Sequence, residues 1–316
     1  MSASIGFIGL GQMGGRIARR LLSKGYQVQA YDPNASALSV VVGAGASPAT
    51  SPKELASRSK YVLMCLPSSR EVEAVCLGTE GVAEGAAAGT VVIDLTSGEP
   101  PDTIRIARAL AERGIRMMDA AVSGGGGAAG ALEGRLTVIA GGDPEVFSEC
   151  LPILKIIGAK IFHVGPIGSG HLTKALNNFL VATTLLATAE AMVVATKSGL
   201  DPSTVVAALQ ASSGRNFATE RRFPLFILKG DFGFDSGGLL RYLVRDANQA
   251  VEAGRELEIP MLISSAVCEL LSVGLAEMGP EATSTDAVRL YERWAKTEVR
   301  ERPGASIALH LGEAAK

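Results

Sequence analysis

Three glycines behind a short apolar run constrain the fold of this chain more than any other feature. The run covers residues 5–8, and Gly9, Gly11 and Gly14 follow it in the order G-x-G-x-x-G, ahead of a helical pattern over residues 16–23. In such a loop the first glycine permits a tight turn, the second lets a pyrophosphate approach the backbone, and the third lets the helix pack on the strand. Glycine-rich turns occur in other strand–helix units too, but here strand, loop, helix and next strand follow in order. The pattern therefore predicts a dinucleotide-binding loop that consists of Gly9, Leu10, Gly11, Gln12, Met13 and Gly14.

An acidic residue ends the second predicted strand, residues 28–31. Asp32 stands eighteen positions beyond Gly14, where a carboxylate accepts hydrogen bonds from the hydroxyls of an adenosine ribose. Its charge would repel a 2′-phosphate, and residues 31–36 contain no Arg or Lys to offset that charge. The sequence thus predicts NAD as the preferred cofactor, with NADP as the second choice. As an alternative, Asp32 is a turn residue ahead of Pro33.

Apolar runs and helical patterns alternate over the first half of the chain. Runs of strand length, with helical segments between most of them, cover residues 5–9, 28–31, 61–66, 91–94, 116–119 and 136–140. Connections of helix length favour parallel strands, so the pattern predicts a doubly wound Rossmann-type α/β sheet with its ligand beyond the carboxyl ends of the strands. The loops expected to carry function follow Ile8, Tyr31, Leu66, Asp94 and Asp119.

The character of the chain changes after residues 165–170, which are rich in glycine. Helical patterns then cover residues 171–198, 202–211, 239–254, 261–274 and 285–295, with hardly a strand between them. We expect an NAD-binding Rossmann domain over residues 1–164 and an all-α domain for substrate binding and dimerisation over residues 165–316, joined by a long interdomain helix. Because residues 179–195 are apolar nearly all round, a second subunit is expected to cover part of this helix in a homodimer or homotetramer.

Charge and cysteine usage exclude several classes of function. The 30 basic and 32 acidic side chains leave a net charge of -2 without a basic run, so neither nucleic acid nor a membrane is expected as a partner. The four cysteines form no CxxC pair, which indicates reduced core thiols, and no metal site is predicted because no cluster has ligand spacing. The first strand begins so near Met1 that no leader fits before it, and we therefore expect a cytoplasmic protein.

A serine followed by glycines comes after the strand predicted over residues 116–119. Ser123, Gly124 and Gly125 would place a hydroxyl and several unobstructed backbone N–H groups at the ligand edge of the sheet. Such a loop suits a carboxylate. A flexible surface loop is the alternative, and glycine content alone does not separate the two.

Lys174 and Asn178 are four residues apart near the start of the first helix after the glycine-rich segment. This spacing puts both side chains on one helix face. Apolar surroundings, a helix N-terminus and a nicotinamide cation would each disfavour the ammonium form of Lys174, and so bring its pKa toward the range that an acid/base needs. Taken alone, a lysine such as Lys174 is more often a surface residue with a partly buried stem.

Together these motifs resemble the β-hydroxyacid dehydrogenase family of the 3-hydroxyisobutyrate dehydrogenase type, over residues 5–295. The resemblance rests on the motifs Gly9-x-Gly11-x-x-Gly14, Leu66-Pro67, Asp119-x-x-Val122-Ser123-Gly124-Gly125, Gly168-x-Gly170-x-x-x-Lys174-x-x-Asn177-Asn178 and Arg245-Asp246. Each motif alone is weak, but their joint occurrence in this order is specific.

The resemblance implies an NAD(P)-dependent hydride transfer to or from the β-carbon of a small 3-hydroxy acid or its semialdehyde. It implies that Lys174 is the general acid/base and that Asn178 helps to place Lys174 and the substrate hydroxyl. It assigns Ser123, Gly124 and Gly125 to the substrate carboxylate. It assigns Leu66, Pro67, Ser97 and Arg245 to the cofactor.

The chain departs from the family pattern in ways that bear on its substrate. Arg245 stands where the family usually has lysine, and Ala121 where proline is usual. An arginine keeps the charge but exchanges no proton at neutral pH. Arg215, Arg221 and Arg222 are close in sequence and favour an acidic substrate, while salt bridges at an interface explain them equally well.

Three alternatives to the small-acid dehydrogenase remain at the level of sequence. One is a dehydrogenase or reductase of a larger sugar acid, which Arg245 would suit. A second is an imine reductase, a related group that usually lacks the lysine at Lys174. The third is a non-catalytic protein that binds NAD(H).

Overall fold

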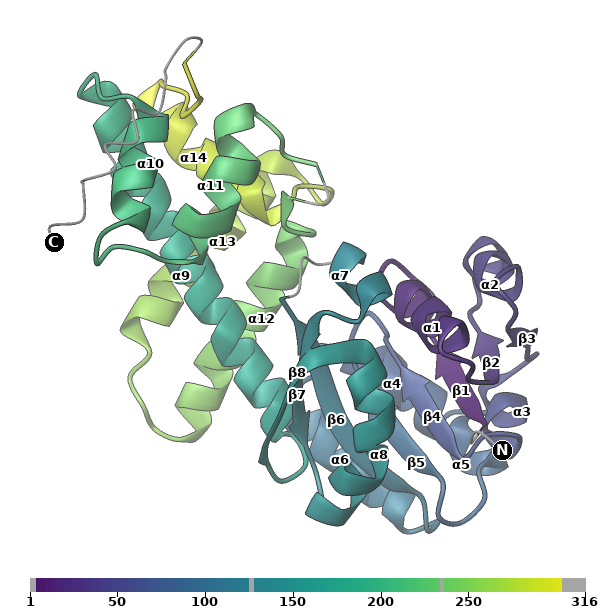
Figure 1. The fold of residues 1–316 in the computed structure, drawn as a ribbon. Helices are drawn as coiled ribbons and strands as arrows, with labels where there is room; N and C mark the ends of the chain where they lie inside the picture. The colour runs from purple at the N-terminus through teal and green to yellow at the C-terminus, as the bar shows by residue number, and fades with distance from the viewer. Residues whose placement is uncertain (1–3, 125–127, 234–235, 303–316) are drawn as a thin grey trace, which may run out of the picture. The chain divides into compact units, whose positions relative to one another are not determined.

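The computed structural model describes residues 4–124, 128–233 and 236–302. The chain divides into two compact units, residues 1–175 and 176–316, whose elements are labelled in Figure 1. The domain boundary expected from the sequence, between residues 164 and 165, stays a prediction.

The first unit is built on one eight-stranded sheet. Its strands are β1 (Ile5–Ile8), β2 (Val28–Tyr31), β3 (Ser47–Pro48), β4 (Tyr61–Met64), β5 (Val91–Asp94), β6 (Arg116–Ser123), β7 (Leu136–Gly141) and β8 (Gly158–Gly165). They lie in the order β3-β2-β1-β4-β5-β6-β7-β8, and all neighbours are parallel except β6 and β7. The chain changes its direction of travel across the sheet between β1 and β4, which is where ligands bind in doubly wound folds. The predicted Rossmann-type sheet is therefore confirmed.

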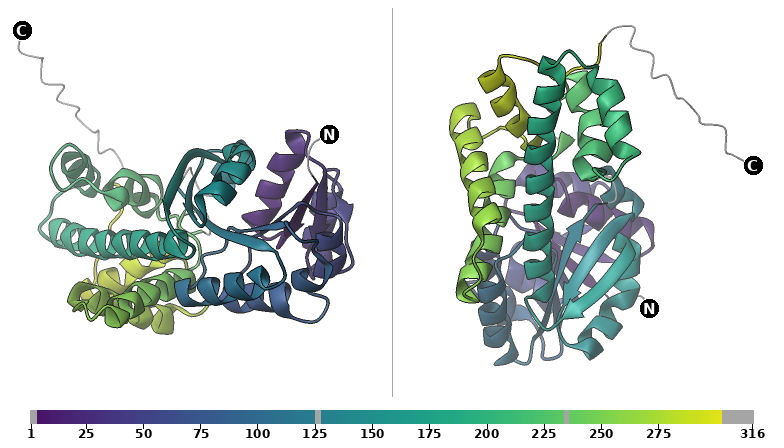
Figure 2. Two further views of the ribbon diagram at one scale, coloured as in Figure 1. Left: turned by 90° about the horizontal axis from the view of Figure 1, so that it is seen from below. Right: turned by 90° about the vertical axis from the view of Figure 1, so that its left-hand side faces the viewer.

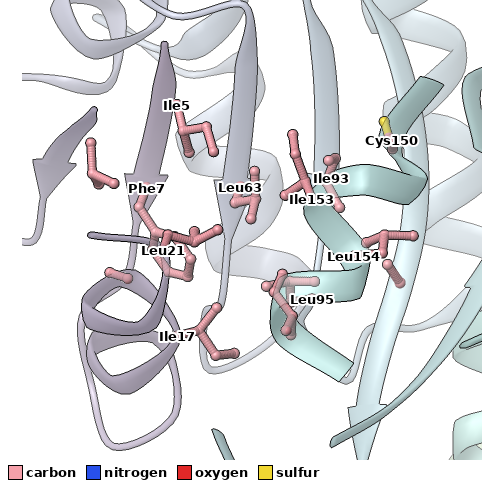
Figure 3. Packing of buried hydrophobic residues seen from close by; sticks show 14 of the residues in the cluster. Ile5, Phe7, Ile17, Leu21, Leu63, Ile93, Leu95, Cys150, Ile153 and Leu154 are labelled. Atoms are coloured by element: carbon pink, nitrogen blue, oxygen red, sulfur yellow. The ribbon is translucent and has the colours of Figure 1, made fainter. Parts of the chain in front are cut away.

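Helices cover both faces of this sheet. On one face, α1 (Gly14–Ser23) and α8 (Pro144–Ile157) insert residues such as Ile17, Leu21 and Ile153 against Phe7 and Leu63 of the strands, as Figure 3 shows. The other face is covered by α3 (Pro52–Ser57), α4 (Ser69–Leu77), α5 (Val82–Gly85) and α6 (Pro100–Ala111). Each fully buried Ile, Leu or Phe contributes about 1.5–3 kcal/mol relative to its exposed state. Packing on both faces of the sheet therefore fixes the positions of the strand ends from which the loops emerge.

The strand predictions missed both edge strands of the sheet and the end of one inner strand. The structure adds β3 and β8, and it extends β6 from the predicted end at Asp119 to Ser123. β3 is only two residues long, and β8 is an edge strand with many exposed positions, so neither has a strong apolar run. β6 and β7 are antiparallel, and the described part of the segment between them contains the helix α7 (Ala128–Glu133).

The second unit is helical. It contains most of α9 (Ser169–Lys197) together with α10 (Pro202–Gln210), α11 (Phe223–Leu225), α12 (Leu240–Glu256), α13 (Leu262–Met278) and α14 (Ala287–Ala295). These elements confirm the expected all-α region. The structure also has a π-helical turn at Ala218–Arg222 and 3-10 turns at Ile227–Lys229 and Ser284–Asp286. The turns around Pro224 were not predicted, because they are too short to show a helical period.

Helix α9 is the core helix of the second unit. Figure 2 shows it as one uninterrupted helix. By length and composition alone it could cross a membrane, with a mean hydropathy of 1.7 over its most apolar window. Its residues Ala182, Leu185, Ala189 and Met192 are buried in the core of this unit. Their spacing of three and four residues is that of a helix packed along one face.

Candidate active site

The three glycines of the first loop serve different purposes. Gly9 has a φ of +87°, and a Cβ there would lie 2.4 Å from the carbonyl oxygen of Cys65. A Cβ on Gly14 would lie 1.9 Å from the carbonyl oxygen of Gly9. Gly11 is exposed, and a Cβ there would meet nothing within 4 Å. The protein's own packing therefore requires the first and third glycines, whereas the second leaves open space beside the backbone.

The N-terminus of α1 suits the pyrophosphate of a dinucleotide. Met13 precedes the helix without a side-chain cap, and no acidic residue stands in the first turn. The positive end of the helix dipole is thus left to an anion from outside. Gln12 is exposed beside this end and accepts a hydrogen bond from Arg16 Nη1 to its backbone oxygen at 2.6 Å. These residues fit the phosphates of NAD(P).

Asp32 connects the glycine loop to the end of β2. Its Oδ2 accepts a hydrogen bond from the backbone N of Leu10 at 2.6 Å, and its Oδ1 accepts one from the backbone N of Asn34 at 2.8 Å. The second bond, to a residue two positions on, is typical of a turn residue. Asp32 therefore also stabilises the turn at Pro33, as the alternative interpretation expected. A carboxylate offers about four acceptor positions, which leaves two for ribose hydroxyls.

The loops after β4 and β5 emerge at the same edge as the glycine loop. The backbone N of Leu66 donates to Thr96 Oγ1 at 3.1 Å, and the side chain of Leu66 lies against Gly9. Pro67 is exposed and Ser97 is half-buried. Beneath them, burial raises the pKa of the Asp94 carboxyl. The predicted cofactor residues of the first unit therefore line one edge of the sheet.

Ser123 and Lys174 meet in the first unit. Ser123 is the last residue of β6, and Lys174 Nζ donates to its Oγ at 3.2 Å. Gly124 is exposed with a φ of +64°, which favours glycine. Gly125 lies outside the described residues. The structure thus brings the predicted acid/base to the hydroxyl of the predicted carboxylate loop, although 51 residues separate them in sequence.

Asp119 anchors the helix that carries Lys174. Its carboxylate is fully buried in β6 and accepts hydrogen bonds from the backbone N of Gly168 at 2.7 Å and of His171 at 2.8 Å. A Cβ on Gly170 would lie 2.7 Å from Asp119 Oδ2. Asp119 therefore caps α9 and holds it on the strand that ends in Ser123. The sequence showed Asp119 only as part of a motif, because no local pattern reveals a partner 49 residues away.

Asn178 belongs to a separate network in the second unit. Asn178 Nδ2 donates to Asp246 Oδ2 at 2.5 Å, and Asn177 Nδ2 donates to Asn178 Oδ1 at 3.0 Å. Arg245 binds the other oxygen of Asp246 through Nε at 2.9 Å and Nη2 at 2.7 Å. Asp246 is buried. It therefore orients both Asn178 and Arg245, a function that sequence analysis missed.

The other sequence candidates lie in different surroundings. Arg215 forms an exposed ion pair with Glu220, Arg221 is exposed, and Arg222 lies over the ring of Phe217. Burial raises the pKa of the Cys65 and Cys150 thiols to about 12, as expected for unreactive core cysteines. Within the described residues, no three His, Cys, Asp or Glu side chains are placed to hold a metal ion.

Comparison with known proteins identifies the family. Residues 4–165 match the model of the NAD-binding domain of 6-phosphogluconate dehydrogenase, and residues 168–291 match that of the NAD-binding region of NADP-dependent 3-hydroxyisobutyrate dehydrogenase. The chain is 37% identical to 2-(hydroxymethyl)glutarate dehydrogenase of Eubacterium barkeri, over 92% of this chain and 96% of that protein. It is 39% identical to the NAD-dependent L-serine dehydrogenase of Pseudomonas aeruginosa, over 68% of this chain and 72% of that protein.

A solved structure confirms the architecture. The 3-hydroxyisobutyrate dehydrogenase of Salmonella typhimurium superposes with a TM-score of 0.80 at 24% identity, over 92% of this chain and 100% of that one. At this sequence identity, the structural similarity shows the fold alone. The sequence relatives and the family models show the family. The chain therefore belongs to the β-hydroxyacid dehydrogenase family and is an NAD(P)-dependent oxidoreductase of the hydroxyacid dehydrogenase type.

Proposed function

We propose that this protein transfers a hydride between a nicotinamide cofactor and the β-carbon of a small 3-hydroxy acid or its semialdehyde, with Lys174 as the acid/base. The observation that carries the proposal is the hydrogen bond of 3.2 Å from Lys174 Nζ to Ser123 Oγ. It places an amine beside a hydroxyl and the exposed Gly124, in a loop suited to a carboxylate.

Each residue has a distinct task in this reaction. The bound nicotinamide supplies or accepts the hydride. In oxidation, neutral Lys174 takes the proton of the substrate hydroxyl, and in reduction its ammonium form returns a proton to the carbonyl oxygen. Ser123, Gly124 and Gly125 hold the substrate carboxylate by donor groups, while Asn178 helps to place Lys174 and the hydroxyl.

The relatives indicate which acids to test first. Their names include 2-(hydroxymethyl)glutarate, L-serine, L-threonate and 3-hydroxyisobutyrate dehydrogenases. All four compounds carry a carboxylate and a hydroxyl on the β-carbon. We therefore propose this pair of groups as the substrate class.

A panel assay tests the proposal. NAD- and NADP-coupled absorbance at 340 nm is followed with these four acids and with glycerate and 4-hydroxybutyrate, whose hydroxyl is one carbon further from the carboxylate. We expect selective turnover of one β-hydroxy acid and little with 4-hydroxybutyrate. Equal rates with 4-hydroxybutyrate would contradict the substrate class.

The three alternatives give different results in the same assay. Turnover of a sugar acid longer than threonate, without turnover of the acids in the panel, would favour the larger sugar acids, for which Arg245 is the candidate contact. Imine reductases share this fold, and reduction of a cyclic imine without any acid turnover would favour that activity despite Lys174. Tight binding of NADH without turnover of any compound would favour a binding protein.

We infer a preference for NAD from Asp32. The support is its carboxylate at the end of β2, anchored by Leu10 at 2.6 Å, with no Arg or Lys over residues 31–36 to balance a 2′-phosphate. Fluorescence titration should show tighter binding of NADH than of NADPH. In Asp32→Asn the difference should shrink, and equal affinities in the unaltered protein would contradict the inference.

We further propose a homodimer or homotetramer in the cytoplasm. Support for the oligomer comes from apolar side chains of the second unit that are highly exposed, among them Leu180 and Val194 of α9 and Leu262 and Ile263 of α13, at 58%, 66%, 80% and 66%. Light scattering on a sizing column measures the mass. The free, mostly buried cysteines support a cytoplasmic location, which cell fractionation tests. The net charge of -2 gives no reason to expect nucleic acid or a membrane as a partner.

A further inference from the structure

His171 is buried in the first unit, one helical turn before Lys174. The residue has no exposed surface, and its backbone N donates to Asp119. Its Nδ1 lies 2.8 Å from Thr103 Oγ1 of α6, and its Nε2 has no hydrogen-bond partner in the described part of the chain. A buried imidazole is costly unless its polar atoms are used. The contact of Nδ1 with Thr103 is therefore the hydrogen bond that fixes the orientation of this ring.

The two hydrogen bonds of Thr103 define the direction of this contact. Thr103 Oγ1 lies 3.0 Å from the backbone oxygen of Glu99 and is itself almost fully buried. A hydroxyl has one proton, and the carbonyl oxygen accepts but never donates. Both bonds form at once only when the threonine donates to Glu99 and His171 Nδ1–H donates to the threonine. His171 is thus a fixed donor to α6.

The same contact reaches the loops that the family resemblance assigns to the cofactor. The imidazole packs directly on Gly98, where a Cβ would lie 2.6 Å from its Nδ1. The next residue, Glu99, donates from its backbone N to Ser69 Oγ at 2.7 Å. Gly98 follows Ser97, and Ser69 begins the helix after Leu66-Pro67. His171 therefore joins the lysine helix to two loops at the edge of the sheet.

We propose that His171 is a positioning residue, which through Thr103 ties the helix of Lys174 to the loop of Ser97 and so keeps Lys174 Nζ beside Ser123. The inference rests on the proposed role of Lys174. Asp119 holds the start of the same helix through two backbone N–H groups. The two contacts act on α9 from β6 and from α6. Together they leave the helix little freedom to rotate or slide.

Four variants test this assignment. Thr103→Val removes the acceptor at nearly constant volume, and His171→Leu removes the donor. His171→Asn retains a donor, since its Nδ2 can occupy the place of the imidazole Nδ1. Thr90→Val is the matched control, because Thr90 is also buried in the first unit, directly ahead of β5, and its hydroxyl makes no hydrogen bond in the described residues.

Steady-state kinetics with the best acid of the panel is the first measurement. A displacement of about 1 Å near the reacting atoms can cost about a hundredfold in rate, so we expect Thr103→Val and His171→Leu to lower kcat about tenfold to hundredfold with KM nearly unchanged. His171→Asn should recover most of the lost kcat, and Thr90→Val should lose none. A kcat unchanged in Thr103→Val, or an Asn variant as slow as the Leu variant, would overturn the proposal.

Amide hydrogen exchange over residues 168–176 is the second measurement and needs no turnover. We expect faster exchange in Thr103→Val than in Thr90→Val, because the helix end has lost one of its two anchors. If the unaltered protein oxidises no acid while Thr103→Val exchanges faster, the proposed function fails and the anchoring role stands. Equal exchange in both threonine variants would remove the anchoring role, whatever the activity.

Discussion

Two buried carboxylates, Asp119 and Asp246, position the residues of the proposed site, one through backbone groups and the other through side chains. In the first unit, Asp119 binds two backbone N–H groups at the start of α9. In the second unit, Asp246 binds the side chains of Asn178 and Arg245. A contact to backbone depends on the path of the chain, whereas a contact to side chains depends on which residues are present. The first unit is therefore expected to respond most to changes that move the backbone, and the second to changes of single polar groups.

The largest expected effect separates Lys174 of the first unit, which exchanges a proton in the proposed reaction, from Asn178 of the second unit, which Asp246 orients. Because general acid/base catalysis contributes about 10²- to 10⁴-fold, Lys174→Ala should lower kcat by about that factor and leave NADH affinity nearly unchanged. Asn178→Ala should lower kcat by about tenfold only, since its amide acts through orientation. Both are measured by steady-state kinetics and NADH titration. A loss confined to KM in Lys174→Ala would assign Lys174 to binding instead.

The glycine loop offers a second test within the first unit. In Gly14→Ala the new Cβ would lie 1.9 Å from a backbone oxygen, so the free energy of unfolding should fall by about 3 kcal/mol. In Gly11→Ala the Cβ meets open space, so stability should stay the same while NADH binding weakens. Urea denaturation and NADH titration measure the two effects. If Gly11→Ala bound NADH normally, the pyrophosphate would not lie beside that residue.

A third test addresses the side-chain network of the second unit. Asp246→Asn removes the charge that faces Arg245 and one of the two acceptor oxygens, and we expect the free energy of unfolding to fall by about 2 kcal/mol. Glu281→Gln is the control, because Glu281 is an exposed carboxylate of the same unit with a side chain 83% accessible. Urea denaturation measures both. Equal stability of the two variants would show that the network orients residues without stabilising the fold.

The smallest expected effect is a loss of stability at alkaline pH in the first unit. Burial raises the pKa of the Cys65 thiol from 9.0 to about 12, so above pH 9 the unfolded chain releases a proton that the folded chain keeps. Stability from this group is complete below pH 9 and is lost as the pH rises toward 12. At pH 10 the loss is about 1.4 kcal/mol. Urea denaturation of the unaltered protein and of Cys65→Ala at pH 8 and pH 10 should show a smaller decrease in the variant.

Most of the fold could be predicted from motifs and apolar periods that are local in the sequence. The first strand, the glycine loop and α1 follow each other within about twenty residues, so their order in the sequence already specifies their contacts. The helices of the second unit were predicted within a few residues, because each has a clear apolar period. Predictions failed for the exposed edge strand β8, for the far end of β6 and for the short turns at 218–229, where no period is long enough to show.

The sequence by itself determined the family, the sheet with its helical partner, and the residue types available for chemistry. Only the tertiary structure decided that β7 runs antiparallel, that Asp119 caps α9, that His171 reaches Thr103 and that Asp246 holds Asn178. Each of these contacts joins residues that are far apart in the sequence and that come together only when the core packs. A hydrogen bond between distant side chains leaves no periodic trace in the sequence, because its geometry exists only after the core has formed.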